Sequence, residues 1–329
     1  DRYSKKLESL NCKIYYINYN PTSFNPILLL SLFFQLINLL FKIKPDILIS
    51  FTFQINLMSI ISKIFFKFRL IVNLTGIGGV LFINRTLSFI LTNFLSLLLN
   101  FSEKVVFQNK DDIKDFEKNL FYFKNNFFLV EGSGINLSRT KKTKILNNKK
   151  FRFGFVGRFL KTKGFLDFCY AAHLFNTKYP NKAVFFAIGS NKPASFQTVN
   201  DKVIKFYKSK KIIKFLPFQS NVRKYLNKID CIVLPSYREG TSKVLLEAGS
   251  IGKLIIASNV PGCKNIIKNN QSGILHKVKS LSSLTNAMEK AINLTTKEYK
   301  KITKNCQMNI NRKFNKDIYI KKMNKKIFS

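Results

Sequence analysis

Residues 234–263 read LPSYREGTSKVLLEAGSIGKLIIASNVPGC, and this stretch holds the most informative pattern of the 329-residue chain. An apolar run ends at Leu234, a polar loop with Glu239 and Gly240 follows, and a helical pattern through Glu247 precedes the next apolar run. This order of strand, loop, helix and strand is typical of a parallel βαβ unit. Ligands of open α/β sheets bind beyond the carboxyl ends of the strands, so the loop is a candidate binding loop.

The chemistry of this loop suits a ligand with both hydroxyl and phosphate groups. The backbone amides of Gly240, Thr241 and Ser242 begin the following helix, where they can face a phosphate or sugar hydroxyls. The carboxylates of Glu239 and Glu247 can accept hydrogen bonds from paired hydroxyls, as on a ribose. The alternative, that both are surface charges, fits poorly because the surroundings are apolar and the chain has only 17 acidic residues.

A second strand-to-helix loop lies in residues 155–164, which read FVGRFLKTKG. Gly157 relieves steric limits where the apolar strand ends. Arg158 and Lys163 follow in the loop, and two cations beside a helix N-terminus make a good site for a diphosphate. The alternative is an ordinary solvated loop, since lysine is frequent throughout this chain.

The alternation of strand and helix patterns extends along the whole chain in two blocks. Strands of the first block are expected at 12–17, 46–50, 70–74, 104–108 and 127–130, with helical patterns between them. We predict an α/β protein with a Rossmann-like domain over 1–138, a lysine-rich linker over 139–150 and a second such domain over 151–296. Basic helices are expected over 297–329.

Charge and composition bound the possible partners. The net charge of +39 attracts anions such as phosphorylated substrates, anionic lipids and nucleic acids. Because the lysines are spread out and no nucleic-acid-binding motif stands out, we expect no nucleic-acid partner. Five scattered cysteines and two histidines leave little material for a metal site, a disulfide framework or a Ser-His-Asp triad, and indicate a cytoplasmic protein.

Two apolar stretches, 27–41 and 87–101, are shorter than the roughly 20 residues of a spanning helix. We predict that they form buried or interfacial helices. Together with the lysines near them, these stretches suggest peripheral attachment to the anionic inner face of a membrane. This attachment is an open expectation.

The quoted stretches resemble the retaining glycosyltransferases of family 4, which have the GT-B fold of two Rossmann-like domains facing a cleft. The frame EGTSKVLLEA at 239–248 matches the family's two glutamates separated by seven residues. The run GKLIIASNVPGC at 252–263, the turn NNQSG at 269–273 and the loop at 155–164 also match. The resemblance implies a glycosyltransferase with its donor site in the second domain.

The resemblance also implies a role for each matched residue. Arg158 and Lys163 would bind the donor diphosphate, Glu239 would contact the transferred sugar, and these three would carry the catalysis. Glu247 would hold the ribose of the nucleotide. The donor-binding set comprises Gly157, Arg158, Lys163, Glu239, Gly240, Thr241, Ser242 and Glu247, and the set that lines the cleft from the first domain comprises Thr75, Gly76 and Gly78. No metal and no cofactor besides the nucleotide-sugar substrate is implied.

Three segments of the first half resemble a subgroup that builds bacterial surface polysaccharides on a lipid carrier. They are NLTGIGGVLF at 73–82, VVFQNKDD at 105–112 and EGSGIN at 131–136. This resemblance implies transfer from a nucleotide-diphosphate sugar, with UDP expected, to a lipid-linked saccharide acceptor. Thr75-Gly76 stands where many relatives have a histidine, a difference that the subgroup tolerates.

Other functions remain open at this point. The family begins with a strand and a glycine loop, and no such opening precedes Cys12, so we expect an N-terminally incomplete first domain. The alternatives are an inactive or truncated glycosyltransferase remnant and a basic nucleic-acid-binding protein. A nucleotide-sugar epimerase would need additional acidic and histidine groups for proton transfer, which two histidines disfavour.

Overall fold

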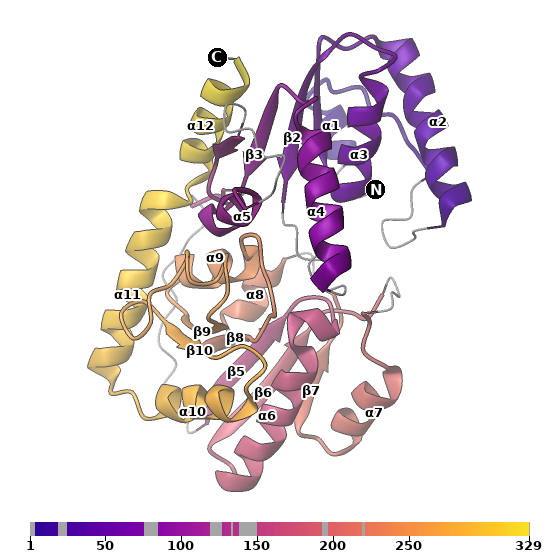
Figure 1. The fold of residues 1–329 in the computed structure, drawn as a ribbon. Coiled ribbons are helices and arrows are strands. Elements are labelled where there is room, and N and C mark those ends of the chain that lie inside the picture. Colours follow the sequence, from indigo (N-terminus) through magenta and orange to yellow (C-terminus); the bar gives the residue numbers. More distant parts are fainter. Residues whose placement is uncertain are drawn as a thin grey trace.

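The computed structural model of the protein shows two parallel β-sheets, each flanked by helices, stacked one above the other (Figure 1). It describes residues 4–18, 25–75, 85–118, 127–132, 134–137, 150–192, 197–218 and 221–328. The predicted α/β class is confirmed, because every strand pair in both sheets is parallel.

The first sheet has the strand order β1-β2-β3-β4. Its strands are β1 (Ile47–Phe51), β2 (Arg69–Leu74), β3 (Lys104–Phe107) and β4 (Phe127–Leu129). The accompanying helices are α1 (Ser4–Glu8), α2 (Pro26–Ile43), α3 (Phe53–Ser62), α4 (Arg85–Leu99) and α5 (Lys110–Phe116). Apolar side chains of α2, α3 and α4 pack on β2 and β3 and form one core.

The strand expected at 12–17 is wrong, because these residues belong to no strand in the structure. The segment lies along α2 instead, where the backbone amide of Asn18 donates to Gln35 Oε1 at 2.9 Å and Lys42 lies over the Tyr15 ring. β-propensity alone does not create a strand where no ladder partner is available.

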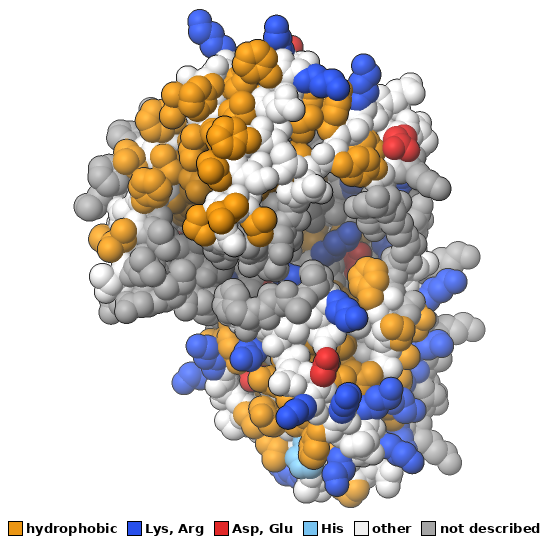
Figure 2. Space-filling model, turned by 90° about the vertical axis from the view of Figure 1, so that its right-hand side faces the viewer, with side chains coloured by type: hydrophobic (Ala, Val, Ile, Leu, Met, Phe, Trp, Pro, Cys, Tyr) orange, Lys and Arg blue, Asp and Glu red, His pale blue; other side chains and the backbone are white. Residues whose placement is uncertain are grey.

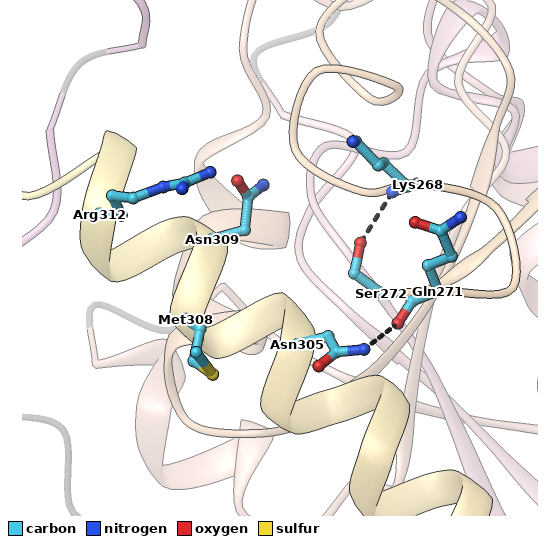
Figure 3. A pocket seen from close by; sticks show the side chains of 7 residues that line it. All are labelled: Lys268, Gln271, Ser272, Asn305, Met308, Asn309 and Arg312. Atoms are coloured by element: carbon cyan, nitrogen blue, oxygen red, sulfur yellow. Dashed lines mark hydrogen bonds between the residues drawn. The ribbon is translucent and has the colours of Figure 1, made fainter.

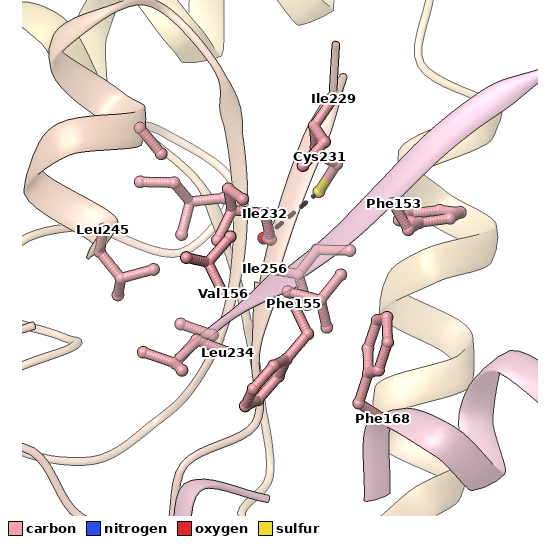
Figure 4. Close-up of a cluster of buried hydrophobic side chains, with 14 of the residues drawn as sticks. Phe153, Phe155, Val156, Phe168, Ile229, Cys231, Ile232, Leu234, Leu245 and Ile256 are labelled. Carbon is pink, nitrogen blue, oxygen red and sulfur yellow. Dashed lines mark hydrogen bonds between the residues drawn. The ribbon is translucent and has the colours of Figure 1, made fainter. Parts of the chain in front are cut away.

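The second sheet has the strand order β10-β9-β8-β5-β6-β7. Its strands are β5 (Phe151–Val156), β6 (Ala183–Ile188), β7 (Ile213–Leu216), β8 (Cys231–Leu234), β9 (Leu254–Ser258) and β10 (Ile274–His276). The accompanying helices are α6 (Phe165–Lys178), α7 (Asp201–Ser209), α8 (Val222–Leu226), α9 (Lys243–Ser250), α10 (Leu281–Ile292) and α11 (Thr296–Lys313). Figure 4 shows side chains of β5 and β8 in the core beside this sheet, together with Phe168 of α6, whose ring centroid lies 5.6 Å from that of Phe155.

The last helix, α12 (Lys316–Phe328), returns to the first sheet, while α11 runs along the second (Figure 1). Met323 and Ile327 of α12 pack with Ile71, Val106 and Val130 of the first domain. The C-terminal end of the chain therefore contributes to the core of the N-terminal domain. The predicted domain boundaries stay predictions, and residues 139–149 of the expected linker lie outside the described residues.

Gly164 allows the loop after β5 to approach the end of β8. Its φ is 69°, and a Cβ atom placed there would lie 1.9 Å from the carbonyl oxygen of Pro235. Both the left-handed backbone and the lack of space require glycine at this position. Gly252 offers a comparison, because its φ is 78° but a Cβ atom placed there would have no neighbour within 4 Å.

We expect Gly164→Ala to destabilise the fold more than Gly252→Ala does. Both variants impose the left-handed cost of about 1–2 kcal/mol, but only Gly164→Ala also pushes the two loops apart. Denaturant unfolding of the two variants beside the wild type measures the difference. Equal losses in the free energy of unfolding would show that the approach of Gly164 to Pro235 imposes no constraint.

Candidate functional site

The two loops singled out in the sequence meet at one edge of the second sheet. Because β5 and β8 are hydrogen-bonded neighbours, the segments after them leave the sheet side by side. The backbone amide of Tyr237 donates to the carbonyl oxygen of Thr162 at 2.9 Å, and the Ser236 hydroxyl donates to the same oxygen at 3.2 Å. The carboxyl ends of these strands thus bring residues 157–164 and 235–242 together.

Lys163 and Glu239 form an ion pair across the two loops, with Nζ 2.6 Å from Oε1. The Glu239 side chain is only 7% exposed, whereas that of Lys163 is 34% exposed. The structure therefore brings together two of the predicted catalytic residues. The buried carboxylate depends on this lysine for charge pairing, while the lysine remains accessible to an anion from solvent.

Gly157 and Arg158 lie at the end of β5, on the same edge of the sheet. The Gly157 amide donates to the carbonyl oxygen of Ile188 at 3.0 Å, and a Cβ placed on Gly157 would have no neighbour closer than 3.8 Å. Arg158 is exposed to solvent. There is therefore space next to Gly157, and the Arg158 cation lies beside it.

The N-terminus of α9 also faces this edge. Ser242 is the N-cap of α9, and its side chain makes no capping hydrogen bond. A capping side chain therefore does not occupy the first-turn amides, which are the groups that bind phosphate or hydroxyl oxygens at helix starts. Glu239, Gly240 and Thr241 form the loop that leads into this helix.

Glu247 lies on α9 itself, with its side chain 4.0 Å from Lys243 Nζ. Burial raises the pKa of its carboxyl above the ordinary value, although the charges of Lys243 and Arg223 act in the opposite direction. A half-buried carboxylate of this kind gains from hydrogen bonds donated by a ligand, because they replace lost water.

Thr75 of the first domain touches the Glu239–Gly240 loop. A Cβ atom on Gly240 would lie 2.2 Å from the Thr75 carbonyl oxygen, so the two backbones are in direct contact. The structure thus brings one predicted cleft residue of the first domain to the predicted donor loop. The other two, Gly76 and Gly78, lie outside the described residues.

Sequence reasoning missed a second set of contacts between the domains. Arg238 pairs with Asp112 at 2.6 Å and with Asp115 at 3.0 Å. Asn109 Nδ2 donates to the Gly240 carbonyl oxygen at 3.1 Å. The available signal was the run VVFQNKDD, which matched the family but was assigned no contact, together with an arginine directly before Glu239.

A separate hollow of about 300 Å³ lies between α11 and the turn that precedes β10 (Figure 3). The turn is the NNQSG segment, and Asn305 of α11 donates to the Gln271 carbonyl oxygen at 3.0 Å. The lining residues are Lys268, Gln271, Ser272, Asn305, Met308, Asn309 and Arg312. This hollow contains none of the predicted site residues.

The described residues offer no group of three or more His, Cys, Asp or Glu side chains that could hold a metal ion. His276 is buried at the end of β10, with its Nε2 3.3 Å from the Ser258 hydroxyl. Burial lowers the pKa of His276 to about 4, so the imidazole is neutral at physiological pH. We assign it a packing role.

Comparison with known proteins decides the family. The sequence profile described as "Glycosyl transferases group 1" matches residues 138–308, which is more than half of the chain. The chain belongs to the group 1 glycosyl transferases. The prediction of a glycosyltransferase is thereby confirmed, whereas the roles of its individual residues stay predictions.

Two relatives have informative names. The chain is 26% identical over 309 residues to N,N'-diacetylbacillosaminyl-diphospho-undecaprenol alpha-1,3-N-acetylgalactosaminyltransferase of Campylobacter jejuni, covering 87% of this chain and 78% of that protein. It is 30% identical over 198 residues to UDP-Gal:alpha-D-GlcNAc-diphosphoundecaprenol alpha-1,3-galactosyltransferase of Escherichia coli, covering 54% of this chain and 48% of that protein.

Among solved structures, Anabaena HepE in complex with UDP-glucose is similar with a TM-score of 0.81 at 17% identity. The match covers 99% of this chain and 88% of that chain. A glycosyltransferase from Rickettsia africae gives a TM-score of 0.74 at 17% identity, covering 98% of this chain and 86% of that chain. At this identity the likeness concerns the fold, and it confirms the predicted GT-B architecture.

We expect sugar-nucleotide binding by this glycosyltransferase to weaken as the pH falls from neutral, and Glu247→Gln to reduce that dependence. The carboxyl pKa is raised, so acidification protonates the predicted acceptor of the ribose hydroxyls at a higher pH than an ordinary glutamate. Titration with UDP-glucose, which has no phosphate monoester to complicate the profile, measures the affinity. An identical pH profile in wild type and variant would contradict the ribose assignment.

Proposed function

We propose that this glycosyltransferase moves a sugar from a UDP-sugar to a lipid-linked saccharide, with retention of anomeric configuration. The observation that carries the proposal is the Lys163–Glu239 pair at the carboxyl edge of the second sheet, beside the start of α9. The relatives from Campylobacter jejuni and Escherichia coli are named for diphospho-undecaprenol-linked acceptors, which supports the acceptor class.

The proposed chemistry depends on charge that is already in place. Arg158, Lys163 and the first amides of α9 stabilise the negative charge on the departing nucleoside diphosphate. Glu239 accepts a hydrogen bond from the transferred sugar and stabilises the positive charge that develops at its anomeric carbon. Glu247 accepts hydrogen bonds from the ribose and fixes the nucleotide along α9.

The Lys163–Glu239 ion pair suggests how the site receives a donor. Lys163 donates to Glu239, which orients the buried carboxylate. An arriving diphosphate adds a second acceptor for the three donors of the ammonium group. The Glu239 carboxylate then accepts a sugar hydroxyl with the lone pairs that Lys163 does not use.

We expect Arg158→Ala and Lys163→Ala each to weaken nucleotide-diphosphate binding. A charge-assisted contact contributes about 1.5–3 kcal/mol, which corresponds to roughly a tenfold to hundredfold loss in affinity. Lys161→Ala is the matched control, since Lys161 is an exposed lysine of the same short 3-10 helix, Lys161–Lys163. Calorimetric titration with UDP gives the constants, and unchanged affinities in both test variants would contradict the diphosphate assignment.

We further propose that no metal ion is needed, because these two cations supply the charge that a metal would otherwise provide. Transfer should then survive a chelator such as EDTA without loss. Restoration of a chelated enzyme by magnesium or manganese would overturn this part of the proposal.

The first domain carries an exposed apolar surface suited to a lipid acceptor (Figure 2). The exposed side chains on and beside α2 and α4 are Ile27, Leu28, Leu30, Phe34, Phe41, Ile43, Phe89, Ile90, Phe94, Leu97 and Phe101. Among the described helices, α2 alone is long and apolar enough to cross a membrane; its Leu32, Leu36 and Leu40 are buried, and the rest of the helix is exposed or half-buried. We propose that this apolar surface lies in the membrane interface, on the cytoplasmic leaflet.

Basic side chains adjoin the apolar surface in the sequence. Lys42 and Lys44 lie at the end of α2, and Lys63 and Lys67 follow α3. A lysine near an anionic bilayer contributes about 1 kcal/mol, so four of them reinforce the apolar contact. Charge and apolar area together support a peripheral attachment rather than a purely soluble state.

We expect the protein to co-sediment with liposomes, more strongly as the anionic lipid fraction rises and less strongly as salt rises. Phe34→Ser with Phe94→Ser should reduce binding, because both rings are more than half exposed on the apolar surface. Phe218→Ser is the control, since Phe218 is 73% exposed but follows β7 in the second domain. No binding at low salt, or an equal loss in the control, would remove the membrane proposal.

The prediction that nucleic acid is not a partner is tested with the same protein. DNA retention that persists at physiological salt, in a protein that does not bind UDP-sugars, would favour nucleic-acid binding instead. We expect DNA retention to disappear as salt rises while UDP-sugar affinity remains.

A further inference from the structure

A buried polar cluster joins the two domains at the residue that precedes Glu239. Asn109 and Asp112 are almost fully buried, and both belong to the first domain, at and after the N-cap of α5. Arg238 comes from the second domain, and its side chain is 17% exposed. Charged groups from two domains thus meet away from water, next to the proposed sugar-binding carboxylate.

The hydrogen bonds of this cluster surround the Glu239 backbone. Arg238 Nη2 donates to Asp112 Oδ1 at 2.6 Å, and Asn109 Nδ2 donates to Asp112 Oδ2 at 2.8 Å. The same Asn109 nitrogen donates to the Gly240 carbonyl oxygen at 3.1 Å. The residues immediately before and after Glu239 are therefore both held by the first domain.

Burying the charged groups of this cluster costs desolvation free energy, which a solvent-exposed ion pair between the two domains would not require. Burial raises the pKa of the Asp112 carboxyl, against the opposing effects of Arg238 and Asn109. Burial alone would lower the pKa of Arg238, but its bonds and charge pairing with Asp112 and Asp115 raise it. Separating Arg238 from Asp112 would leave a charge buried without a partner, which is unfavourable. The two side chains are therefore held in one relative geometry.

A second cross-domain ion pair lacks these features. Lys264 Nζ lies 2.9 Å from Asp111 Oδ1, but the two side chains are 41% and 26% exposed. A solvated pair of this kind contributes little to stability. It tethers the same two domains without bonding to the residues that flank Glu239, and it therefore provides a natural comparison.

We propose that Arg238 is a positioning residue: through Asp112 and Asn109 of the first domain it holds the Glu239 loop in the geometry that transfer requires. The inference rests on the proposed function, because it takes Glu239 to be the carboxylate that contacts the transferred sugar. If Arg238 acts in this way, the geometry of the donor site depends on how closely the two domains approach each other. When the first domain moves away, Asp112 and Asn109 leave together, and the loop around Glu239 loses both supports.

Close backbone packing supports this dependence. Gly240 has no room for a side chain beneath the Thr75 carbonyl oxygen, and the Thr241 hydroxyl donates to the Gln108 carbonyl oxygen at 3.3 Å. The residue before Glu239 and the two residues after it thus all contact the first domain. The loop is therefore in contact with the first domain on both sides of Glu239.

The test compares Arg238→Gln with Lys264→Gln in the full chain, with circular dichroism to show that both fold. Hydrogen–deuterium exchange without ligand is the first measurement. We expect faster amide exchange in residues 238–247 for Arg238→Gln and no change there for Lys264→Gln. Unchanged exchange in Arg238→Gln would overturn the proposal whatever the activity, because this measurement does not depend on transfer.

Kinetics provide the second measurement. Misplacing a catalytic group by about 1 Å can cost a hundredfold in rate, so we expect kcat to fall by about that factor while UDP affinity changes little. Arg238→Lys should recover part of kcat, because it retains the charge at Asp112. A loss of UDP affinity equal to the loss in kcat, or no recovery with lysine, would overturn positioning. The wild-type protein could transfer no sugar while Arg238→Gln still shows faster amide exchange. That combination would contradict the proposed function but not the support of the loop by Arg238.

Discussion

The neighbouring positions of β5 and β8 in the second sheet bring the two loops of the candidate site together. Phe153 pairs with Cys231 and Gly154 with Ile232, although the two strands lie far apart in the chain. Gly154 packs directly on Ile229, since a Cβ placed on Gly154 would lie 2.4 Å from the end of the Ile229 side chain. Because both strands run in the same direction, their loops leave the sheet together, and Lys163 reaches Glu239.

Several of the few acidic residues in this strongly basic chain form buried ion pairs. With 56 cationic side chains and 17 acidic ones, most lysines have no acidic partner to pair with, and many of them are exposed. In the described part of the chain, three carboxylates are instead buried and paired: Glu239 with Lys163, Asp112 with Arg238, and Asp230 with Arg152. The excess of positive charge favours the approach of a phosphorylated donor, while these pairs join separate segments of the fold.

Much of the site could be predicted from the sequence because the rule of parallel sheets places chemistry after the strands. The meeting of the 155–164 loop with the 235–242 loop follows from that rule and is found in the structure. The Arg238–Asp112 pair could not be predicted, because periodicity describes each domain alone and says nothing of how two domains approach. The same limit applies to α12, whose apolar face packs on the other domain. The expected strand at 12–17 failed for a related reason, since strand formation depends on a partner elsewhere in the chain.

A crystal structure of the protein with an intact UDP-sugar would locate the donor. We expect the diphosphate within hydrogen-bonding distance of Lys163 and Arg158, the ribose at Glu247 and the sugar at Glu239. A nucleotide bound in the hollow between α11 and residues 268–272, with the Lys163–Glu239 loops unoccupied, would show that these loops are not the donor site.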